Sequence, residues 1–327
     1  MRMRRLGANG PAVGEIGLGC MSFAGAYGNA APGEAEAVLD AAREHGITHL
    51  DTAKIYGDGQ SEEILGKYLK SHPHKFTLAT KGGILTQPQR GIDNSAAYLR
   101  DCLEGSLKRL GVEHVGLYYV HRRDVTIPIE EVTGTLSRFV EEGKIGGIGY
   151  SEISPASLRR ANAVHRVMAV QSEYSLWSRQ PELGMLAACE ELGTAFVAFS
   201  PLARGLFANV IPDPEQFSPG DFRRHNPRFQ PDTFPQNAIY ARHFAELARD
   251  MGHTSSALAI AWVLHRSPAI HAIPGTRSAA HLIEDIKAAA ITLDAEAMAA
   301  IEAVLPAGFA HGARYSAQQF VGVEIYG

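Results

Sequence analysis

The chain has 327 residues, of which 45% are hydrophobic and 20% are charged, as is ordinary for a globular protein. A net charge of −4 argues against a nucleic-acid-binding protein, because such proteins usually carry a basic patch or a high pI. The longest apolar runs, such as 194–202, are too short to cross a membrane. We expect no signal peptide, since Gly, Asn and Pro follow the N-terminal arginines. The scattered cysteines, Cys20, Cys102 and Cys189, are typical of free thiols in a reducing cytoplasm.

Short β-rich runs alternate along the chain with longer stretches in which apolar residues recur three or four positions apart, as in amphipathic helices. The runs predict strands over 15–20, 49–53, 76–81, 115–121, 146–151, 169–174, 195–201 and 271–274. The stretches between them predict helices over 33–45, 62–70, 96–110, 129–142, 155–164, 181–192, 237–251 and 279–289. Strict alternation implies parallel strands with crossover helices. Eight such units favour a closed (β/α)8 TIM barrel, although periodicity alone leaves an open doubly wound sheet possible.

Three segments fall outside the eight units. Residues 1–14 contain the turn signal Ala8-Asn9-Gly10-Pro11, which predicts an N-terminal β-hairpin that closes the barrel floor. Residues 204–235 are rich in Pro, Gly, Phe, Arg and Asp and predict a long active-site loop. The segment from Pro306 onward is also irregular. No shift in composition marks a domain boundary, so we expect a single barrel domain over 1–327.

Polar side chains stand at the ends of several predicted strands, where the active site of a parallel barrel lies. Asp51 and Tyr56 follow the second strand, Lys81 ends the third, and His121 ends the fourth. Each alone has an ordinary explanation, such as a helix cap, a solvated lysine or a hydrogen-bonded core histidine. Together at one barrel mouth they form an acid–base set, which indicates an enzyme.

Several stretches resemble the aldo-keto reductase family. Residues 51–57, Asp-Thr-Ala-Lys-Ile-Tyr-Gly, resemble the family signature with its Asp and Tyr, and 76–81 and 117–122 resemble the strands that end in its catalytic Lys and His. Further similar stretches, in family order, are 148–151, 170–175, 199–205 and 273–277. The similarity runs from about residue 5 to about residue 305. It implies an eight-stranded α/β barrel and an enzyme that reduces aldehydes or ketones with NADPH.

The resemblance assigns catalytic roles to the four strand-end residues. Tyr56 would donate the proton to the carbonyl oxygen. Because a free tyrosine titrates near 10, an ammonium such as Lys81 would be needed to lower its pKa. Asp51 would hold that ammonium in place, and His121 would orient the carbonyl by hydrogen bonding.

The resemblance also implies cofactor contacts. Ser151 and Gln171 would bond the nicotinamide carboxamide, with Glu152 at a position where the family commonly has Asn, and Phe199 would stack on the ring. The pyrophosphate would lie on Ser200, Leu202, Arg204 and Gly205, and the adenosine end on Gly275, Thr276, Arg277, Ser278, His281 and Asp285. Arg277 and Ser278 suit a 2′-phosphate and favour NADPH over NADH. His281 and Asp285 weaken that preference, since many members carry Arg and Asn there.

The sequence indicates fewer residues of the substrate pocket than of the cofactor site. Phe23 and Tyr27 are expected in an apolar pocket for a small carbonyl compound. One alternative is an NADP-binding interaction module resembling the β-subunits of potassium channels. Another, a metal hydrolase using Asp51 and His121, is disfavoured because no His or acidic partners stand at ligand spacing. A helix-face pair, Glu62-Glu63, is expected to be solvated, and the sequence does not indicate an oligomeric state.

Overall fold

The computed structural model describes residues 1–28, 31–72, 76–86 and 91–326. Within these residues the central sheet has eight parallel strands, in the order β3-β4-β5-β8-β9-β10-β11-β12. Their bounds are β3 (Leu18–Gly19), β4 (His49–Asp51), β5 (Thr77–Gly82), β8 (Leu117–Val120), β9 (Ile148–Ser151), β10 (Val167–Glu173), β11 (Ala195–Phe199) and β12 (Ile270–Ile273). A parallel bridge from Ile16 to Ala272 joins the two edges. The predicted barrel is therefore confirmed.

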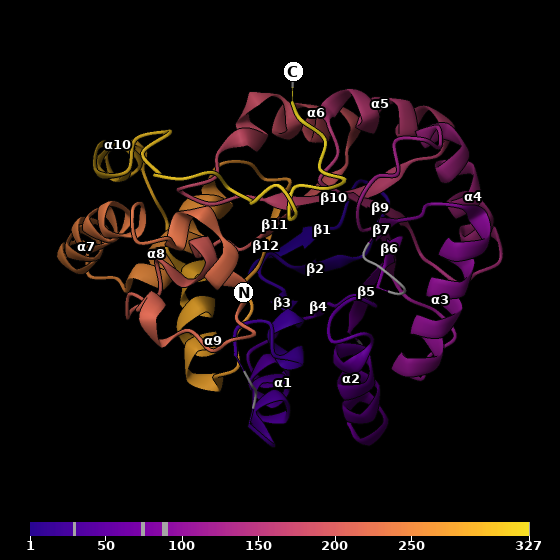
Figure 1. Ribbon diagram of the computed structural model, residues 1–327, viewed down its shortest axis with the longest axis horizontal. Coiled ribbons are helices and arrows are strands. Elements are labelled where there is room, and N and C mark those ends of the chain that lie inside the picture. The colour runs from indigo at the N-terminus through magenta and orange to yellow at the C-terminus, as the bar shows by residue number, and fades with distance from the viewer. Residues whose placement is uncertain (29–30, 73–75, 87–90, 327) are drawn as a thin grey trace.

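Helices surround this sheet (Figure 1). The ring consists of α1 (Glu34–Glu44), α2 (Gln60–Ser71), α3 (Ala96–Leu110), α4 (Ile129–Glu141), α5 (Pro155–Val164), α6 (Met185–Leu192), α8 (Ser255–His265) and α9 (Ala279–Ile286). Two more helices, α7 (Phe234–Asp250) and α10 (Ala295–Val304), lie on the outer side of α8, at the left of Figure 1.

The helix before β12 differs from the prediction. The amphipathic stretch 237–251 forms α7, but α7 packs on α8, and it is α8 that contacts β12. Every residue of α8 from Ser255 to Leu264 is buried. A helix enclosed on all sides has no polar face, so its sequence lacks the 3.6-residue period that marks a surface helix. Helix α10 was not predicted either, and the predicted helix 181–192 is divided at Gly184.

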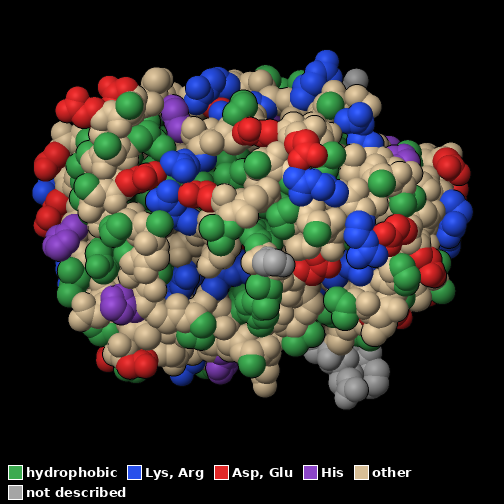
Figure 2. Space-filling view, turned by 90° about the horizontal axis from the view of Figure 1, so that it is seen from above, with side chains coloured by type: hydrophobic (Ala, Val, Ile, Leu, Met, Phe, Trp, Pro, Cys, Tyr) green, Lys and Arg blue, Asp and Glu red, His purple; other side chains and the backbone are tan. Residues whose placement is uncertain are grey.

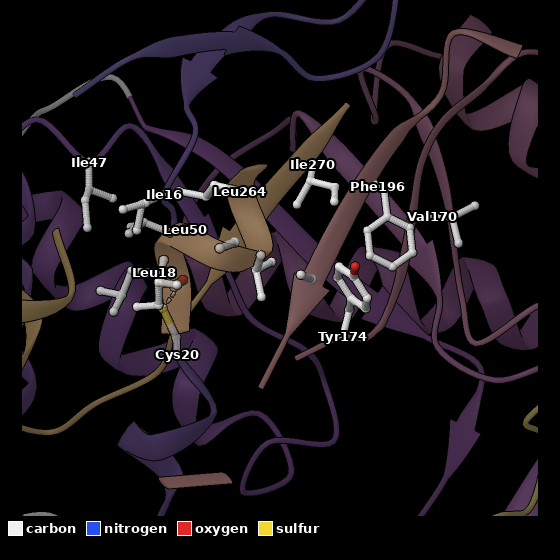
Figure 3. Close-up of a cluster of buried hydrophobic side chains, with 14 of the residues drawn as sticks. Ile16, Leu18, Cys20, Ile47, Leu50, Val170, Tyr174, Phe196, Leu264 and Ile270 are labelled. Carbon is white, nitrogen blue, oxygen red and sulfur yellow. Dashed lines mark hydrogen bonds between the residues drawn. The ribbon is translucent and has the colours of Figure 1, made fainter. Parts of the chain in front are cut away.

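The strands alternate their side chains between two cores, as a barrel requires. Leu117 and Tyr119 of β8 point into the barrel, whereas Tyr118 and Val120 belong to the layer between sheet and helices. Figure 3 shows part of that outer layer, where Phe196 of β11 and its neighbours on β10 and β12 pack together.

The N-terminal hairpin closes the bottom of the barrel, as predicted. It consists of β1 (Met3–Arg5) and β2 (Ala12–Gly14), which pair antiparallel. Leu6 and Val13 are fully buried in the inner core together with Leu117 and Tyr119. These side chains fill the N-terminal end of the barrel interior.

The long loop 204–235 and the first turn of α7 are both hydrogen-bonded to the C-terminal tail. Asn226 donates to the carbonyl of Arg314 at 2.8 Å, and Asn237 donates to that of His311 at 2.9 Å. Two further short strands, β6 (Ile84–Leu85) and β7 (Gly91–Ile92), pair antiparallel after β5. Over the face that carries α5 and α6, positive and negative side chains are interspersed (Figure 2).

Candidate active site

An open cavity of about 790 Å³ lies at the C-terminal ends of the barrel strands. Most of the predicted site residues line it. They are Asp51, Tyr56, His121, Ser151, Gln171, Phe199, Ser200, Leu202, Arg204, Gly205, Gly275, Thr276, Arg277, Ser278, His281, Asp285 and Tyr27. Three others, Lys81, Glu152 and Phe23, are buried and do not line it.

Lys81 lies at the centre of the polar group on the cavity floor. Its ammonium donates to Asp51 Oδ1, to the carbonyl of Thr52 at 2.8 Å and to the Tyr56 hydroxyl at 3.3 Å. The Lys81 side chain is completely buried. An ammonium has three donors, and all three are used here. Lys81 is therefore fixed in place, with Tyr56 between it and the cavity.

The same contacts set the protonation of this group. Burial by itself would lower the pKa of Lys81, but the attraction of Asp51 and Tyr56 outweighs burial and holds that pKa above its ordinary value. Burial raises the pKa of Tyr56, and Lys81 offsets only part of this effect. The resemblance implied a lowered tyrosine pKa; in the structure the net direction is upward. Tyr56 is consequently a protonated phenol at neutral pH.

Gln171 and His121 complete the arrangement around this group. Gln171 on β10 donates its amide to Asp51 Oδ2 at 2.8 Å, so both carboxylate oxygens of Asp51 are bonded. The rings of His121 and Tyr56 meet edge to face with centroids 5.8 Å apart. The cavity floor thus carries a phenol and an imidazole side by side, which can donate hydrogen bonds to one acceptor atom.

The segment after β11 turns sharply along the cavity wall. Ser200, Ala203 and Arg204 adopt positive φ angles of 52°, 52° and 57°, and Gly205 follows at 96°. Non-glycine residues rarely adopt this left-handed conformation, and such strain clusters at ligand sites. Phe199 precedes the turn and also lines the cavity.

Arg204 lines the cavity, but its charge is already neutralised. The guanidinium donates to the buried carboxylate of Glu173 at 2.5 Å. It also lies between the rings of Phe222 and Tyr315, 4.9 Å from each centroid. Arg204 therefore connects β10, the long loop and the C-terminal tail.

Glu152 has a position that the sequence did not indicate. Both of its carboxylate oxygens accept from Arg314, at 2.9 and 2.6 Å, and one also accepts from the backbone N–H of Glu173 at 2.8 Å. These bonds hold the C-terminal tail against β9 and β10. No local signal could reveal this pair, because its members are 162 positions apart.

The two predicted substrate-pocket residues differ in position. Phe23 is only 2% exposed and belongs to the core between sheet and helices, so it does not face the cavity. Tyr27 lines the cavity, and the guanidinium of Arg223 lies 5.1 Å from its ring centroid. Arg122, the last residue of the stretch 117–122, was given no role from the sequence, but it also lines the cavity.

The segment after β12 forms another part of the cavity wall. Arg277 donates to the carbonyl of Gly28 at 3.2 Å, and the Ser278 hydroxyl caps α9. Gly275 approaches β3 so closely that a Cβ would lie 2.9 Å from the carbonyl oxygen of Gly19, which requires glycine there. Burial raises the pKa of Asp285 to about 7.

The part of the chain that the structure describes has neither a group of metal ligands nor a membrane-spanning helix. In 1–28, 31–72, 76–86 and 91–326, no three or more His, Cys, Asp or Glu side chains are grouped to hold a metal ion. None of the helices in those ranges has the length and apolarity needed to span a bilayer.

Comparisons with known proteins agree with this geometry. The model of the Aldo/keto reductase family matches residues 15–306. A probable aldo-keto reductase 1 from Glycine max is 39% identical over 317 residues, covering 95% of this chain and 91% of that protein. The chain therefore belongs to the aldo/keto reductase family of oxidoreductases.

Two solved structures of the same family have similar folds. The glycerol dehydrogenase AKR11B4 from Gluconobacter oxydans superposes with a TM-score of 0.84 and 28% identity, covering 93% of this chain and 94% of that one. The holo form of the aldo-keto reductase AKR11C1 from Bacillus halodurans superposes with a TM-score of 0.76 and 26% identity, covering 98% of this chain and 99% of that one.

Proposed function

We propose that this protein is a cytoplasmic enzyme that reduces aldehydes or ketones to alcohols with NADPH. The observation that carries the proposal is the fully bonded Lys81, which donates to the Tyr56 hydroxyl on the floor of a large cavity. Three buried free cysteines fit a reducing compartment.

The cavity suits a dinucleotide. Phe199 lines the cavity, the left-handed turn 200–205 follows it, and Arg277 and Ser278 line the cavity after β12. Arg277 and Ser278 supply donors for a 2′-phosphate, which NADH lacks. Ser151 and Gln171 also line the cavity, where the Ser151 hydroxyl and the side-chain carbonyl of Gln171 can bond a carboxamide. When bound, NADPH would supply the hydride.

The side chains of the floor supply the remaining chemistry. A carbonyl oxygen placed between Tyr56 and His121 accepts a hydrogen bond from each, so it is oriented and polarised. The phenol proton of Tyr56 passes to that oxygen as negative charge develops on it. Lys81 stabilises the phenolate that remains, and Asp51 keeps the ammonium within reach of it.

The variant Tyr56→Phe tests this assignment, because it removes the proton donor and keeps the ring. We expect kcat/KM for 4-nitrobenzaldehyde to fall by roughly 10² to 10⁴-fold, the usual contribution of a general acid. NADPH affinity, measured by fluorescence titration, should stay within about twofold, since the hydroxyl is not a cofactor contact in this proposal.

Tyr240→Phe, in α7 and away from the cavity, is the matched control. Full activity of Tyr56→Phe would refute the assignment. If the wild-type protein binds NADPH but reduces no aldehyde, the alternative of a cofactor-binding interaction module is favoured.

A further inference from the structure

Arg122 places a guanidinium beside the proposed reaction centre. It follows His121 at the end of β8 and lines the cavity. One of its nitrogens donates to the carbonyl of His121 at 2.7 Å and to the Ser151 hydroxyl at 3.2 Å. Strand β8 lies between β5, which carries Lys81, and β9. Arg122 is also close enough to lower the pKa of Tyr56 through its charge, although burial of Tyr56 is the larger effect.

Arg122 differs from neighbouring cavity arginines in its ion pairing. Arg204 is paired with Glu173 at 2.5 Å and Arg223 with Asp221 at 2.7 Å. Among the residues that the structure describes, no carboxylate lies within the 4.0 Å of an ion pair from Arg122. On the outer face that carries α5 and α6, by contrast, charges of both signs are interspersed (Figure 2). Arg160 on α5, for example, pairs with Glu130 at 2.7 Å.

The C-terminal tail holds the stem of Arg122 in place. Gly322 has a φ of +75°, and a Cβ there would lie 2.8 Å from the Arg122 Cβ, so the tail backbone covers the base of this side chain. The Gly322 carbonyl accepts from the Arg123 N–H at 3.2 Å, and Glu324 pairs with Arg123 at 3.3 Å. A restrained guanidinium loses less conformational entropy when it binds an anion.

We propose that Arg122 anchors a carboxylate on the substrate, so that the preferred substrates are aldehydes or ketones that also carry a carboxylate. A guanidinium matches a carboxylate with two parallel hydrogen bonds. The inference rests on the proposed carbonyl reduction. Hydride adds to the carbonyl carbon, the Tyr56 proton goes to its oxygen, and the carboxylate is unchanged.

The position of Arg122 favours a substrate carboxylate over a cofactor phosphate. The turn 200–205 follows β11 and Arg277 follows β12, and two strands, β9 and β10, separate β8 from β11. Arg122 therefore lies on the side of the mouth where the carbonyl compound meets Tyr56.

The experiment compares 4-formylbenzoate with its uncharged methyl ester at saturating NADPH. We expect wild-type kcat/KM to favour the acid by about tenfold or more, and Arg122→Gln to lower the acid-to-ester ratio by about 10 to 100-fold, as for loss of a hydrogen bond between charged groups. Arg122→Lys keeps the positive charge but loses the paired donors of the guanidinium, so its acid-to-ester ratio should lie between those of the wild type and Arg122→Gln. Arg159→Gln removes the same charge from the exposed surface and should leave the ratio within twofold.

An acid-to-ester ratio near one in the wild type, or one that Arg122→Gln leaves unchanged, overturns the proposal. Weaker NADPH binding in Arg122→Gln with an unchanged ratio would overturn it in favour of a cofactor contact. If no carbonyl compound is reduced, the proposed function fails. Calorimetric titration of 4-(hydroxymethyl)benzoate into the NADP⁺-loaded protein then tests separately whether Arg122 binds a carboxylate. At least tenfold weaker binding to Arg122→Gln supports the anchor, and equal binding overturns it.

Discussion

Asp285 is a buried carboxyl group whose ionisation should reduce the stability of the fold. It is 2% exposed, and burial raises its pKa from 3.8 to about 7, with the Ser256 hydroxyl opposing this effect and Glu284 adding to it. One pKa unit corresponds to about 1.4 kcal/mol, so the full shift corresponds to about 4 kcal/mol. Because the pKa is higher in the folded state, the free energy of unfolding falls as the pH rises from about 4 to about 7.

The variant Asp285→Asn keeps the shape of this side chain and cannot ionise. Relative to wild type, its free energy of unfolding should be higher by up to about 4 kcal/mol at pH 8, with a gain that shrinks as the pH falls and vanishes near pH 4. Urea denaturation without cofactor, followed by tryptophan fluorescence at pH 5, 6, 7 and 8, measures this difference.

A substitution at an exposed aspartate provides the control. Asp232→Asn should change the free energy of unfolding by less than about 0.5 kcal/mol at every pH. A gain for Asp285→Asn that is the same at pH 5 and pH 8, or a loss at pH 8, would show that burial does not disfavour the ionised carboxylate.

Two further variants test a buried ion pair and the cofactor preference. Glu62 accepts from Thr80 at 2.5 Å and from Arg109 at 2.7 Å and is fully buried, so Glu62→Ala should lower the free energy of unfolding by about 3 kcal/mol, as measured by urea denaturation. Glu63→Ala, at the exposed neighbour, should cost less than about 0.5 kcal/mol, and equal costs would contradict this reasoning. In steady-state kinetics, Arg277→Ala should lower kcat/KM about tenfold or more with NADPH and less than threefold with NADH; equal losses would show that Arg277 does not bind the 2′-phosphate.

The burial of Glu62 differs from what the sequence predicts. Glu62 and Glu63 are adjacent helical carboxylates, and we expected both to be solvated. The structure buries Glu62 against β5 and α3 and leaves Glu63 exposed. Composition alone could not separate them, because the distinction depends on where Arg109, 47 positions away, is placed.

The barrel and the four strand-end residues could be predicted from the sequence, with periodicity favouring the barrel and the family resemblance assigning the roles. Each strand is a local apolar run, each surface helix has a local period, and parallel strands bring their carboxyl ends to one mouth. Those local rules were sufficient to bring Asp51, Tyr56, Lys81 and His121 together.

Features that depend on residues distant in the chain could not be predicted from the sequence. Helix α8 is buried on all sides, so its sequence has no amphipathic period. Glu152 pairs with Arg314 and does not line the cavity. In the folded protein, burial raises the pKa of Tyr56 by more than the charge of Lys81 lowers it. Burial and charge pairing depend on residues that are distant in the sequence, so they cannot be predicted from the neighbours of a buried or paired side chain.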